Sequence, residues 1–379
     1  MALLSVPLAD LRRRTSLKWR LYASDVLPMW VAEMDVEMLP AAHEVVTEAL
    51  RRGDTGYPTG TAYAEAFAAM AAQRWQLELS VRGQIRRAGD VMNSISAILE
   101  ATTNPGDAVV INPPIYPPFR QVVSGYGREI VEVPLTAQGR LDLDGLAEAF
   151  AGPAAPRAFL LCSPHNPTGT IHTAAELTAV MKLAEAHSVQ VISDEIHSRL
   201  IDPGAEFVPI LAVPGGERAV VATSAGKAWN LAGFKAGLIV AGTGAREILD
   251  ALPPLAQQSS GHLANLAHTA ALRYGQEWVD ELMVEVSENK RLLAAELARK
   301  LPSVHYQPTP GTYLAWVDCS GLDLPDPVRH FRELGRVAFS PGVSFAGSHQ
   351  QWARINLACA PEVVTEAVDR MAASINDLE

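Results

Sequence analysis

The chain has few cysteines, no excess of basic residues and no long apolar run, and each of these absences excludes a class of protein. Only three cysteines occur among 379 residues, Cys162, Cys319 and Cys359, and their spacing does not match that of a metal site. A small, odd number of cysteines argues against a disulfide-stapled fold and is typical of structural thiols in a reducing compartment.

Acidic residues outnumber basic ones, 42 to 31, which gives a formal net charge of −11 at pH 7. This balance argues against a nucleic-acid-binding surface, and no basic stripe along the chain contradicts it. The densest basic cluster is short, so it predicts a solvated face or an arm. Its members are Arg12, Arg13, Arg14, Lys18 and Arg20.

The longest apolar runs fall well short of a membrane span. The apolar stretch Met1–Pro7 precedes the nearby arginines instead of following them, so it does not have the pattern of a signal peptide. A hydrophobic fraction of 48% and a charged fraction of 19% are typical of a globular protein. We therefore expect a cytoplasmic protein with no membrane or nucleic-acid partner.

Short apolar runs alternate with helical patterns from about residue 85 onward. This alternation predicts an α/β fold in which helices sandwich a mainly parallel sheet, because strands covered on both faces are apolar throughout. Helices are expected over Ala62–Trp75, Ile95–Thr102 and Ala174–Ala186. The expected strands are Asp107–Ile111, Ala158–Cys162, Val189–Ile192, Val220–Ala222 and Gly237–Val240.

The pattern changes after Pro253 and Pro254. Two long helical patterns, 263–275 and 277–300, are followed by short extended runs and a final helix, which predicts a smaller α+β domain. The extended runs are Thr312–Val317, Arg336–Phe339 and Arg354–Leu357. We expect three parts: an irregular N-terminal arm (1–45) that contributes to the small domain, a large domain (46–255) and a small C-terminal domain (256–379).

Lys227 follows the predicted strand Val220–Ala222 and lies among Trp229, Leu231 and Phe234. An amine in apolar surroundings has a lowered pKa, so its neutral, nucleophilic form becomes available for Schiff-base chemistry. An isolated lysine at this point is more often a surface residue that opens a loop. The functional interpretation therefore depends on the other residues that gather at the same edge of the sheet.

Ligands of open α/β sheets bind at the carboxyl ends of the strands, and polar or aromatic residues follow several of the predicted strands here. Tyr116, Asn166, Asp194 and His197 come after three of them, and Lys227 after a fourth. Singly, these residues have ordinary explanations: core packing for the tyrosine, a turn for the asparagine, a helix cap for the aspartate, a satisfied core position for the histidine. Together they match a pyridine aldehyde that carries a phosphate.

Each of these side chains has a role in such a site. Asp194 can pair with a pyridine nitrogen and keep it protonated, Tyr116 can stack on the ring, and Asn166 and His197 can donate to a ring oxygen. A phosphate needs donors, which Ser224 offers together with backbone amides at the start of the helix predicted over Ile95–Thr102. Those amides belong to Ser94 and Ile95.

Three motifs resemble the fold-type I pyridoxal-phosphate enzymes, the large aminotransferase-like family, over essentially the whole chain. They are SPHNPTGT at 163–170, SDEIH at 193–197 and SAGKAWNLAGFKAG at 224–237. The sequence is more narrowly similar to the bacterial cystathionine β-lyase, or carbon–sulfur lyase, branch. That similarity rests on PMWVAEMD at 28–35, DTGYP at 54–58, SDEIH, and KAWNLAG at 227–233.

The resemblance implies pyridoxal 5'-phosphate as the cofactor, with Lys227 as the Schiff-base lysine and Asp194 on the pyridine nitrogen. It places Asn166 on the ring hydroxyl and Tyr116 on the ring face, so Lys227, Asp194 and Tyr116 form the expected catalytic group. It also implies a homodimer in which Tyr57 reaches the phosphate of the neighbouring subunit.

For the substrate, the resemblance implies that Arg354 holds the carboxylate of an amino acid, since a guanidinium pairs with a carboxylate through two hydrogen bonds and a lysine cannot. An edge-strand arginine is the ordinary alternative. Trp30 and Ala32, both within PMWVAEMD, and Asn166 complete the expected substrate-binding set. No metal is expected.

Three positions depart from the general aminotransferase pattern. His197 stands where many of those enzymes have a tyrosine, and Gly226 replaces a serine that often precedes the lysine. Lys235 stands in place of an arginine, which reduces a forked phosphate contact to a point charge. The role of Lys235 is therefore an open question at this stage.

These observations predict a pyridoxal-phosphate-dependent β-elimination enzyme that cleaves the Cβ–S bond of cystathionine or a related cysteine S-conjugate. An aminotransferase acting on a small amino acid is an alternative, because the same cofactor site serves both reactions. A non-catalytic interaction protein on the same fold is a second alternative. The presence of Lys227, Asp194 and Arg354 argues against it, since a scaffold does not need all three.

Overall fold

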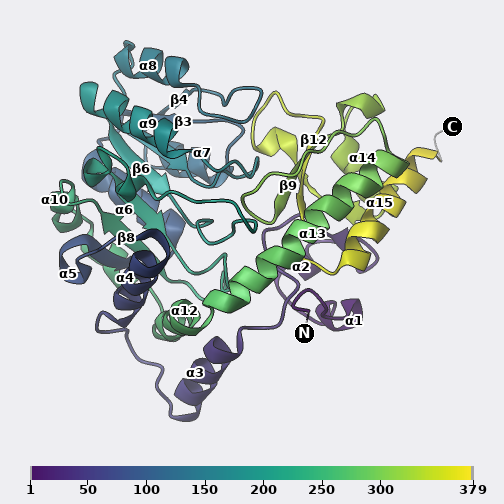
Figure 1. Cartoon of the computed structure of the whole chain (residues 1–379), viewed down its shortest axis with the longest axis horizontal. Helices are drawn as coiled ribbons and strands as arrows, with labels where there is room; N and C mark the ends of the chain where they lie inside the picture. Colours follow the sequence, from purple (N-terminus) through teal and green to yellow (C-terminus); the bar gives the residue numbers. More distant parts are fainter. Residues whose placement is uncertain (1, 377–379) are drawn as a thin grey trace.

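Seven strands form the large sheet of the computed structural model, which describes residues 2–376 (Figure 1). The β8 strand runs antiparallel to both of its neighbours, β2 and β7, and the other neighbouring pairs are parallel. In order across the sheet the strands are β2 (Ile85–Ala88), β8 (Gly237–Ala241), β7 (Val220–Thr223), β6 (Gln190–Asp194), β5 (Ala158–Cys162), β3 (Ala108–Ile111) and β4 (Glu129–Glu132).

Alternate residues of each inner strand point into two apolar cores, one on each face of the sheet. In β5, for example, Phe159 and Leu161 belong to one core, and Leu160 and Cys162 to the other. The first core is closed by α4 (Ala62–Trp75), α8 (Leu143–Ala151), α9 (Ala174–Ala186) and α12 (His262–Tyr274). The second is closed by α6 (Val91–Thr102), α7 (Pro118–Gly125), α10 (Arg246–Asp250) and α11 (Pro254–Gln258).

The predicted α/β fold is confirmed, because helices flank a mainly parallel sheet and each predicted strand of the large domain is present. Helices α4 and α9 and strand β5 have the predicted bounds. Two strands at the edges of the sheet were not predicted. Arg86 and Arg87 lie in β2, and Glu129 and Glu132 end β4, so neither strand has an apolar run that marks it in the sequence.

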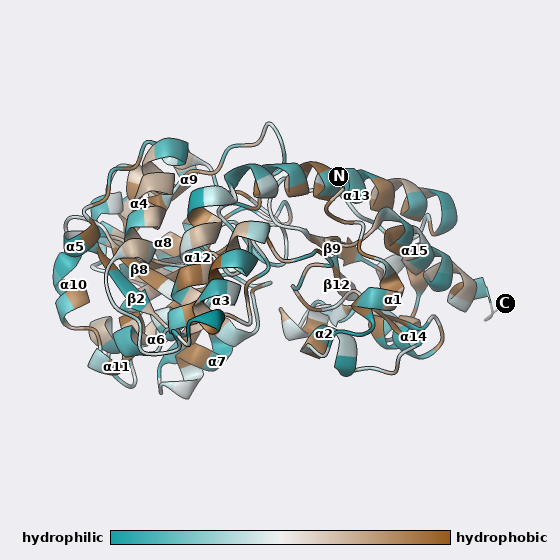
Figure 2. Ribbon diagram, turned by 90° about the horizontal axis from the view of Figure 1, so that it is seen from below, coloured by the Kyte–Doolittle hydropathy of each residue, from teal (hydrophilic) through white to brown (hydrophobic). Residues whose placement is uncertain are grey.

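A second sheet builds the smaller lobe. Its three strands are antiparallel, in the order β11 (Ser340–Pro341), β12 (Trp352–Asn356) and β9 (Leu314–Asp318). Helix α13 (Gln276–Lys300) runs from the larger lobe across the smaller one (Figure 2). The lobe also contains α14 (Pro327–Glu333) and α15 (Pro361–Asn376), and α13 packs against α15.

The N-terminal arm contacts this smaller lobe through β1 (Leu27–Pro28), which pairs in parallel with β10 (Val337–Ala338). The arm is not irregular throughout, because it contains α1 (Leu8–Leu11), α2 (Leu17–Arg20) and most of α3 (Pro40–Arg51). The prediction that its basic cluster is solvated is wrong for one member. Lys18 is buried and pairs with the Asp35 carboxylate at 2.6 Å, a partner that the sequence pattern does not reveal.

Helix α12 packs against α3 and α4 on the larger lobe, and only α13 enters the smaller one. We therefore propose that the domain boundary lies at Gly275, between α12 and α13, instead of at residue 255. The last helix not yet placed, α5 (Val81–Gln84), precedes β2.

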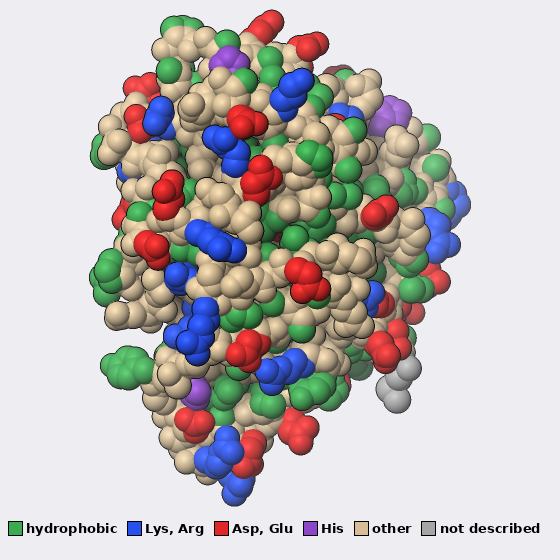
Figure 3. Space-filling view, turned by 60° about the vertical axis from the view of Figure 1, so that its left-hand side comes forward, with side chains coloured by type: hydrophobic (Ala, Val, Ile, Leu, Met, Phe, Trp, Pro, Cys, Tyr) green, Lys and Arg blue, Asp and Glu red, His purple; other side chains and the backbone are tan. Residues whose placement is uncertain are grey.

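Charged side chains of both signs are interspersed on the face shown in Figure 3, without a large patch of one sign. Within residues 2–376, no helix has both the length and the apolarity needed to cross a membrane.

Candidate active site

The predicted polar residues meet where the strands of the large sheet approach the smaller lobe. They line a cavity of about 190 Å³, and other walls of this cavity are apolar side chains such as Val31, Ile196 and Leu231. The predicted site residues in its lining are Ala32, Tyr116, Asn166, Asp194, His197, Ser224, Lys227, Lys235 and Arg354.

A larger cavity of about 850 Å³ lies elsewhere between the two lobes. Among residues 2–376, its lining includes the aromatic residues Trp316 and Trp352 and one carboxylate, Asp318, but no lysine or arginine. That part of the lining therefore offers no amine for a Schiff base and no guanidinium for a carboxylate. Volume alone would identify this cavity as the candidate active site. The amine of Lys227 and the guanidinium of Arg354 instead favour the cavity of about 190 Å³.

Lys227 is placed in the loop after β7, and its amine points toward the N-terminal arm. The Nζ atom donates to the carbonyl of Ala32 at 2.7 Å. Burial, followed by the positive charge of Arg354, lowers the pKa of Lys227 to about 8. A substantial fraction of this amine is therefore neutral just above neutral pH, as nucleophilic and proton-transfer chemistry requires.

Asp194 ends strand β6 and is buried. One carboxylate oxygen accepts the backbone amide of Ile196 at 3.0 Å. Burial raises the pKa of Asp194 to about 7, and the amide and the nearby Lys227 oppose that rise. A carboxylate that is costly to bury gains most from a cationic partner, which a protonated pyridine nitrogen supplies.

His197 and Asn166 lie on the loops that follow β6 and β5, and both are buried. Burial lowers the pKa of His197 to about 3, so its ring is neutral, and its Nδ1 atom lacks a hydrogen-bond partner among the described residues. The Asn166 carbonyl oxygen accepts from Arg354 at 3.1 Å. The Tyr116 ring is half-buried in the cavity wall and crosses Phe119 edge to face.

Arg354 lies on β12 and brings the smaller lobe into the site. Its guanidinium donates to Asn166, to the carbonyl of Trp30 at 3.0 Å and to the hydroxyl of Ser340 at 3.2 Å, and it lies 4.9 Å from the centre of the Phe345 ring. Its buried Nε atom has no partner in the described part of the chain. Arg354 forms no salt bridge with a carboxylate of the described residues. A carboxylate ligand would therefore meet a positive charge that is fixed in place by hydrogen bonds and not neutralised by a protein carboxylate.

The prediction that the amides of Ser94 and Ile95 bind the phosphate is wrong, because neither residue lines the cavity. Helix α6 begins at Val91, four residues earlier than expected, so the Ser94 amide donates to the Asp90 carbonyl at 2.9 Å inside the helix. Ile95 is fully buried in the apolar core. The first-turn amides beside the cavity belong to Val91 and Met92.

The signal that would have found this start is Asp90, a preferred N-cap residue that accepts the Asn93 amide at 2.8 Å. The same carboxylate pairs with the amine of Lys235 at 2.9 Å at the mouth of the cavity. Across from it, the Ser224 hydroxyl donates to the Ala236 carbonyl at 2.7 Å and accepts the amide of Gly226. These groups gather donors and one lysine at the helix N-terminus, as phosphate binding requires.

Besides Ser94 and Ile95, two predicted residues, Trp30 and Tyr57, lie outside the cavity lining. The Trp30 ring crosses Tyr22 edge to face, and only its backbone carbonyl contacts a site residue, Arg354. Tyr57 is 97% exposed in the turn after α3, so within one chain it contributes nothing to this site. Its predicted role concerns a second subunit.

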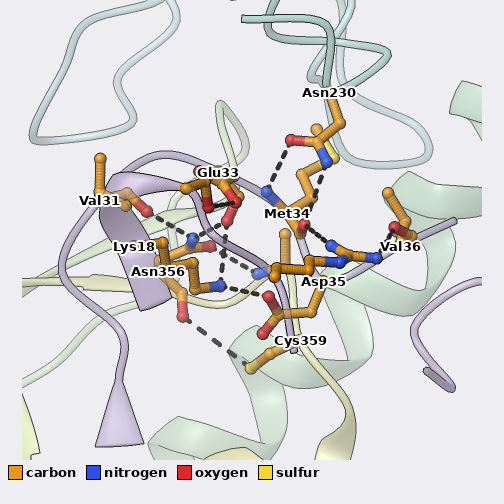
Figure 4. Close-up of polar contacts among 12 residues, drawn as sticks. Lys18, Val31, Glu33, Met34, Asp35, Val36, Asn230, Asn356 and Cys359 are labelled. Carbon is orange, nitrogen blue, oxygen red and sulfur yellow. Dashed lines mark hydrogen bonds and ion pairs between the residues drawn. The ribbon is translucent and has the colours of Figure 1, made fainter. Parts of the chain in front are cut away.

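Sequence reasoning also missed the polar network that holds the segment Trp30–Val36 against the site (Figure 4). Asn230, three residues after Lys227, exchanges hydrogen bonds with the backbone of Met34 at 2.9 and 3.1 Å. Asn356, two residues after Arg354, holds two more carbonyls of the segment. Each asparagine lies close in sequence to a charged residue of the predicted site, Asn230 to Lys227 and Asn356 to Arg354. No spacing pattern in the sequence predicts their contacts with the arm.

Comparisons with known proteins agree with this geometry. The chain is 42% identical to a candidate cystathionine β-lyase of Mycobacterium leprae, over 97% of this chain and 96% of that protein. It is 30% identical to a cystathionine β-lyase of Corynebacterium glutamicum, over 96% of this chain and 98% of that one.

A crystal structure from Corynebacterium diphtheriae, of a candidate pyridoxal-phosphate-dependent β-cystathionase, superposes with a TM-score of 0.92. It has 30% sequence identity and covers 99% of each chain. The sequence model of one family, aminotransferase class I and II, matches residues 24–371. The resemblance drawn from the motifs is thereby confirmed, and the chain belongs to the aminotransferase class I and II family.

Proposed function

We propose that the chain is a pyridoxal-phosphate-dependent carbon–sulfur β-lyase. It takes cystathionine or a related cysteine S-conjugate and water to a thiol, which is homocysteine for cystathionine, together with pyruvate and ammonia. The observation that carries this proposal is the convergence of Lys227 and Arg354, from different lobes, on one buried cavity. Relatives named cystathionine β-lyase support the choice of reaction.

The donor set of the cavity fits pyridoxal phosphate. Among residues 2–376, Asp194 is a buried carboxylate that has Lys227 nearby but forms no salt bridge, and the His197 Nδ1 atom lacks a hydrogen-bond partner. Lys227, Asp194 and Asn166 would hold the reactive ring, with Tyr116 on its face. The α6 amides of Val91 and Met92, the hydroxyl of Ser224 and the amine of Lys235 would hold its phosphate. When bound, the cofactor supplies an electron sink for a carbanion at the substrate Cα.

Lys227 carries the proton in this proposal. With a pKa of about 8, its neutral form can take the Cα proton, and its ammonium form can give a proton to the departing sulfur. The Ala32 carbonyl, 2.7 Å from Nζ, gives the amine a fixed acceptor while it is charged. Tyr116 is a second candidate donor, since burial raises its pKa and keeps its hydroxyl protonated at neutral pH.

Arg354 binds and orients the substrate. Its guanidinium is held in place by Asn166, Ser340 and the Trp30 carbonyl. Binding of a substrate carboxylate therefore does not have to pay the entropic cost of ordering the Arg354 side chain. Because Arg354 belongs to the smaller lobe and Lys227 to the larger one, a bound carboxylate also ties the lobes together. The buried location excludes water and strengthens both interactions.

Product analysis tests the proposal. The purified protein is incubated with cystathionine and no added keto acid, and pyruvate and homocysteine are followed. Many turnovers with equal amounts of both products support the lyase. A single turnover that bleaches the cofactor absorbance, with activity restored by a keto acid, would mean an aminotransferase. Neither change in a protein that carries the cofactor would support the non-catalytic alternative.

We further propose a homodimer whose partner supplies Tyr57 to the phosphate end of the cavity. Tyr57 is 97% exposed, and Leu50 at the end of α3 and Tyr274 at the end of α12 are also largely exposed. Because α3 packs against α12, this side of the larger lobe offers an apolar surface suited to a symmetric interface. Sedimentation at assay concentration should give a dimer, and a fully active monomer would refute the shared site.

A cytoplasmic location stays a prediction. The three cysteines are free and buried, which agrees with thiols that serve packing in a reducing compartment. Burial raises the pKa of each thiol, so none is activated for redox chemistry.

A further inference from the structure

The segment Trp30–Val36 presents its backbone carbonyls to both sides of the site, and neighbouring carbonyls point in different directions. The carbonyl of Ala32 accepts the amine of Lys227, whereas that of Trp30 accepts from Arg354. This short piece of the arm therefore contacts the proposed proton carrier and the proposed carboxylate-binding group at the same time. Its conformation sets the position of both acceptors.

Asn356 holds this segment on the two sides of Ala32. Its Nδ2 atom donates to the carbonyl of Val31 at 2.8 Å and to the carbonyl of Glu33 at 2.6 Å (Figure 4). Its side-chain oxygen accepts the amide of Ala358 at 2.9 Å, which fixes the amide plane. Asn356 is 1% exposed, so water does not compete for these bonds.

The consequence for Ala32 is geometric. With the carbonyls before and after it held on the Asn356 side, the Ala32 carbonyl faces the opposite way, toward Lys227. A second layer supports the arrangement, because Lys18 donates to the same Glu33 carbonyl at 3.1 Å and Asn230 holds Met34. Asn356 is the member of this network that acts on both neighbours of Ala32.

We propose that Asn356 is a positioning residue for Lys227: it aims the Ala32 carbonyl at the lysine amine and so holds that amine where it exchanges protons with the substrate. The proton exchange rests on the proposed function, whereas the positioning does not. Asn356 does not line the cavity, so it acts on the site through the Trp30–Val36 segment.

The test replaces Asn356 with leucine, which keeps the volume and removes the donors. A hydrogen bond to an ammonium stabilises the charged form, so losing the Ala32 acceptor should lower the pKa of Lys227 by roughly one unit. The other charged or titratable groups that face Lys227 and do not depend on Asn356 are Arg354 from β12, Lys235, Asp194 from β6 and His197. The Glu33 carboxylate belongs to the segment that Asn356 holds, and its withdrawal would lower the pKa of Lys227 in the same direction.

The readout is the pH dependence of Lys227 acetylation by acetic anhydride, measured by peptide mass spectrometry on protein freed of cofactor. The Asn356→Leu midpoint should fall by roughly one pH unit, and kcat of the holoenzyme by about tenfold. Asn289 supplies a matched control, because its Nδ2 atom also donates to two backbone carbonyls, of Leu357 and Cys359, and is equally buried. Asn289→Leu should leave the Lys227 midpoint unchanged.

An unshifted midpoint in folded Asn356→Leu would overturn the proposal, as would an equal shift in Asn289→Leu. If Asn356→Leu does not fold, Asn356→Ser, which keeps one donor, replaces it and should give a smaller shift in the same direction. No shift in Asn356→Ser would then overturn the proposal. Failure of the proposed lyase activity would show separately, as absence of pyruvate from wild-type protein with an intact labelling midpoint.

Discussion

At the scale of single residues, the proposed roles of the site are divided between the two lobes, and burial shifts the pKa of the residues that carry them. Lys227 and Asp194 come from loops and strand ends of the large sheet, whereas Arg354 comes from the smaller lobe. Burial is the largest cause of the shift in pKa for all three. Burial in the cavity therefore leaves more of the Lys227 amine neutral and makes ionic contacts stronger than they are in water.

Reduction with borohydride should attach a pyridoxyl label to Lys227. Its amine lies in the cavity with a pKa of about 8, while the amine of Lys235 is held by Asp90 at the mouth. Peptide mapping of the reduced protein locates the label. Lys235→Ala is the matched control and should leave the label on Lys227. A label on Lys235, or none, would remove Lys227 from its assigned role.

The variant Arg354→Lys keeps the charge and loses the fork. Loss of a charge-assisted contact to the substrate carboxylate should reduce kcat/KM by an amount equivalent to roughly 2–4 kcal/mol. The absorbance of the bound cofactor should stay as in the wild type, because Arg354 is assigned to the substrate. Steady-state kinetics and a spectrum suffice. If kcat/KM stays near the wild-type value, the carboxylate binds elsewhere.

At the scale of elements, the arm is anchored more firmly than its sequence suggests. Lys18 on α2 is buried against Asp35, and it also donates to the Glu33 carbonyl. Removing one partner of a buried ion pair leaves the other charge buried and uncompensated. The arm therefore depends on this pair for its position over the site.

Lys18→Met should lower the free energy of unfolding by about 3–5 kcal/mol, because Asp35 would remain as an uncompensated buried carboxylate. Urea unfolding monitored by fluorescence measures the change. Arg13→Met is the control from the same basic cluster; the Arg13 side chain is 84% exposed, so its loss should matter by less than about 0.5 kcal/mol. Equal effects of the two substitutions would show that the pair does not anchor the arm.

A helix or strand can be predicted from the sequence when its burial requires a recognisable pattern of apolar residues. Strand β5 is buried along its whole length and was predicted with its bounds, whereas the edge strand β4 is half-exposed and was missed. The start of α6 was displaced by four residues because its first turn contains polar residues, and that error moved the phosphate amides to Ser94 and Ile95. Local spacing also gives no sign of the Lys18–Asp35 pair, which only the folded arm creates.

At the scale of the whole molecule, the composition of the core predicts a dependence of stability on pH. Burial lowers the pKa of four histidines from 6.5 to about 4 for His165 and His268, and to about 3 for His172 and His197. Between about pH 4 and 6.5 the unfolded chain therefore binds protons that the folded chain does not, so these groups make stability rise with pH.

Acids whose pKa burial raises act in the opposite sense; they are Asp35, Asp194, Glu195 and Asp202. Burial raises the pKa of Asp194 to about 7 and that of Glu195 to about 8, so between pH 5 and 6.5 the folded chain holds two protons that the unfolded chain has lost. The four histidines set against Asp194 and Glu195 leave a net gain of roughly 3 kcal/mol from pH 5 to pH 6.5, which Asp35 and Asp202 make smaller. Urea midpoints of the cofactor-free protein across this range measure it.

His268→Gln supplies the internal control for this prediction, since it removes one of the four titrating groups and should make the rise with pH shallower. Its ring contacts the Tyr63 hydroxyl and the Phe234 carbonyl, and His268 is not part of the lining of the cavity that contains Lys227. A wild-type midpoint that does not change between pH 5 and 6.5 would contradict the balance of groups.

The pairing of the arm with the smaller lobe also constrains how the protein is made on the ribosome. The hydroxyl of Ser340 donates to the carbonyl of Trp30, 310 residues earlier in the chain, and Arg354 donates to the same carbonyl. At synthesis rates of roughly 5–20 residues per second, the arm emerges roughly 15–60 seconds before its partners do. A nascent chain can thus form the large sheet early, but it acquires a complete catalytic cavity only after Ser340 and Arg354 have been synthesised.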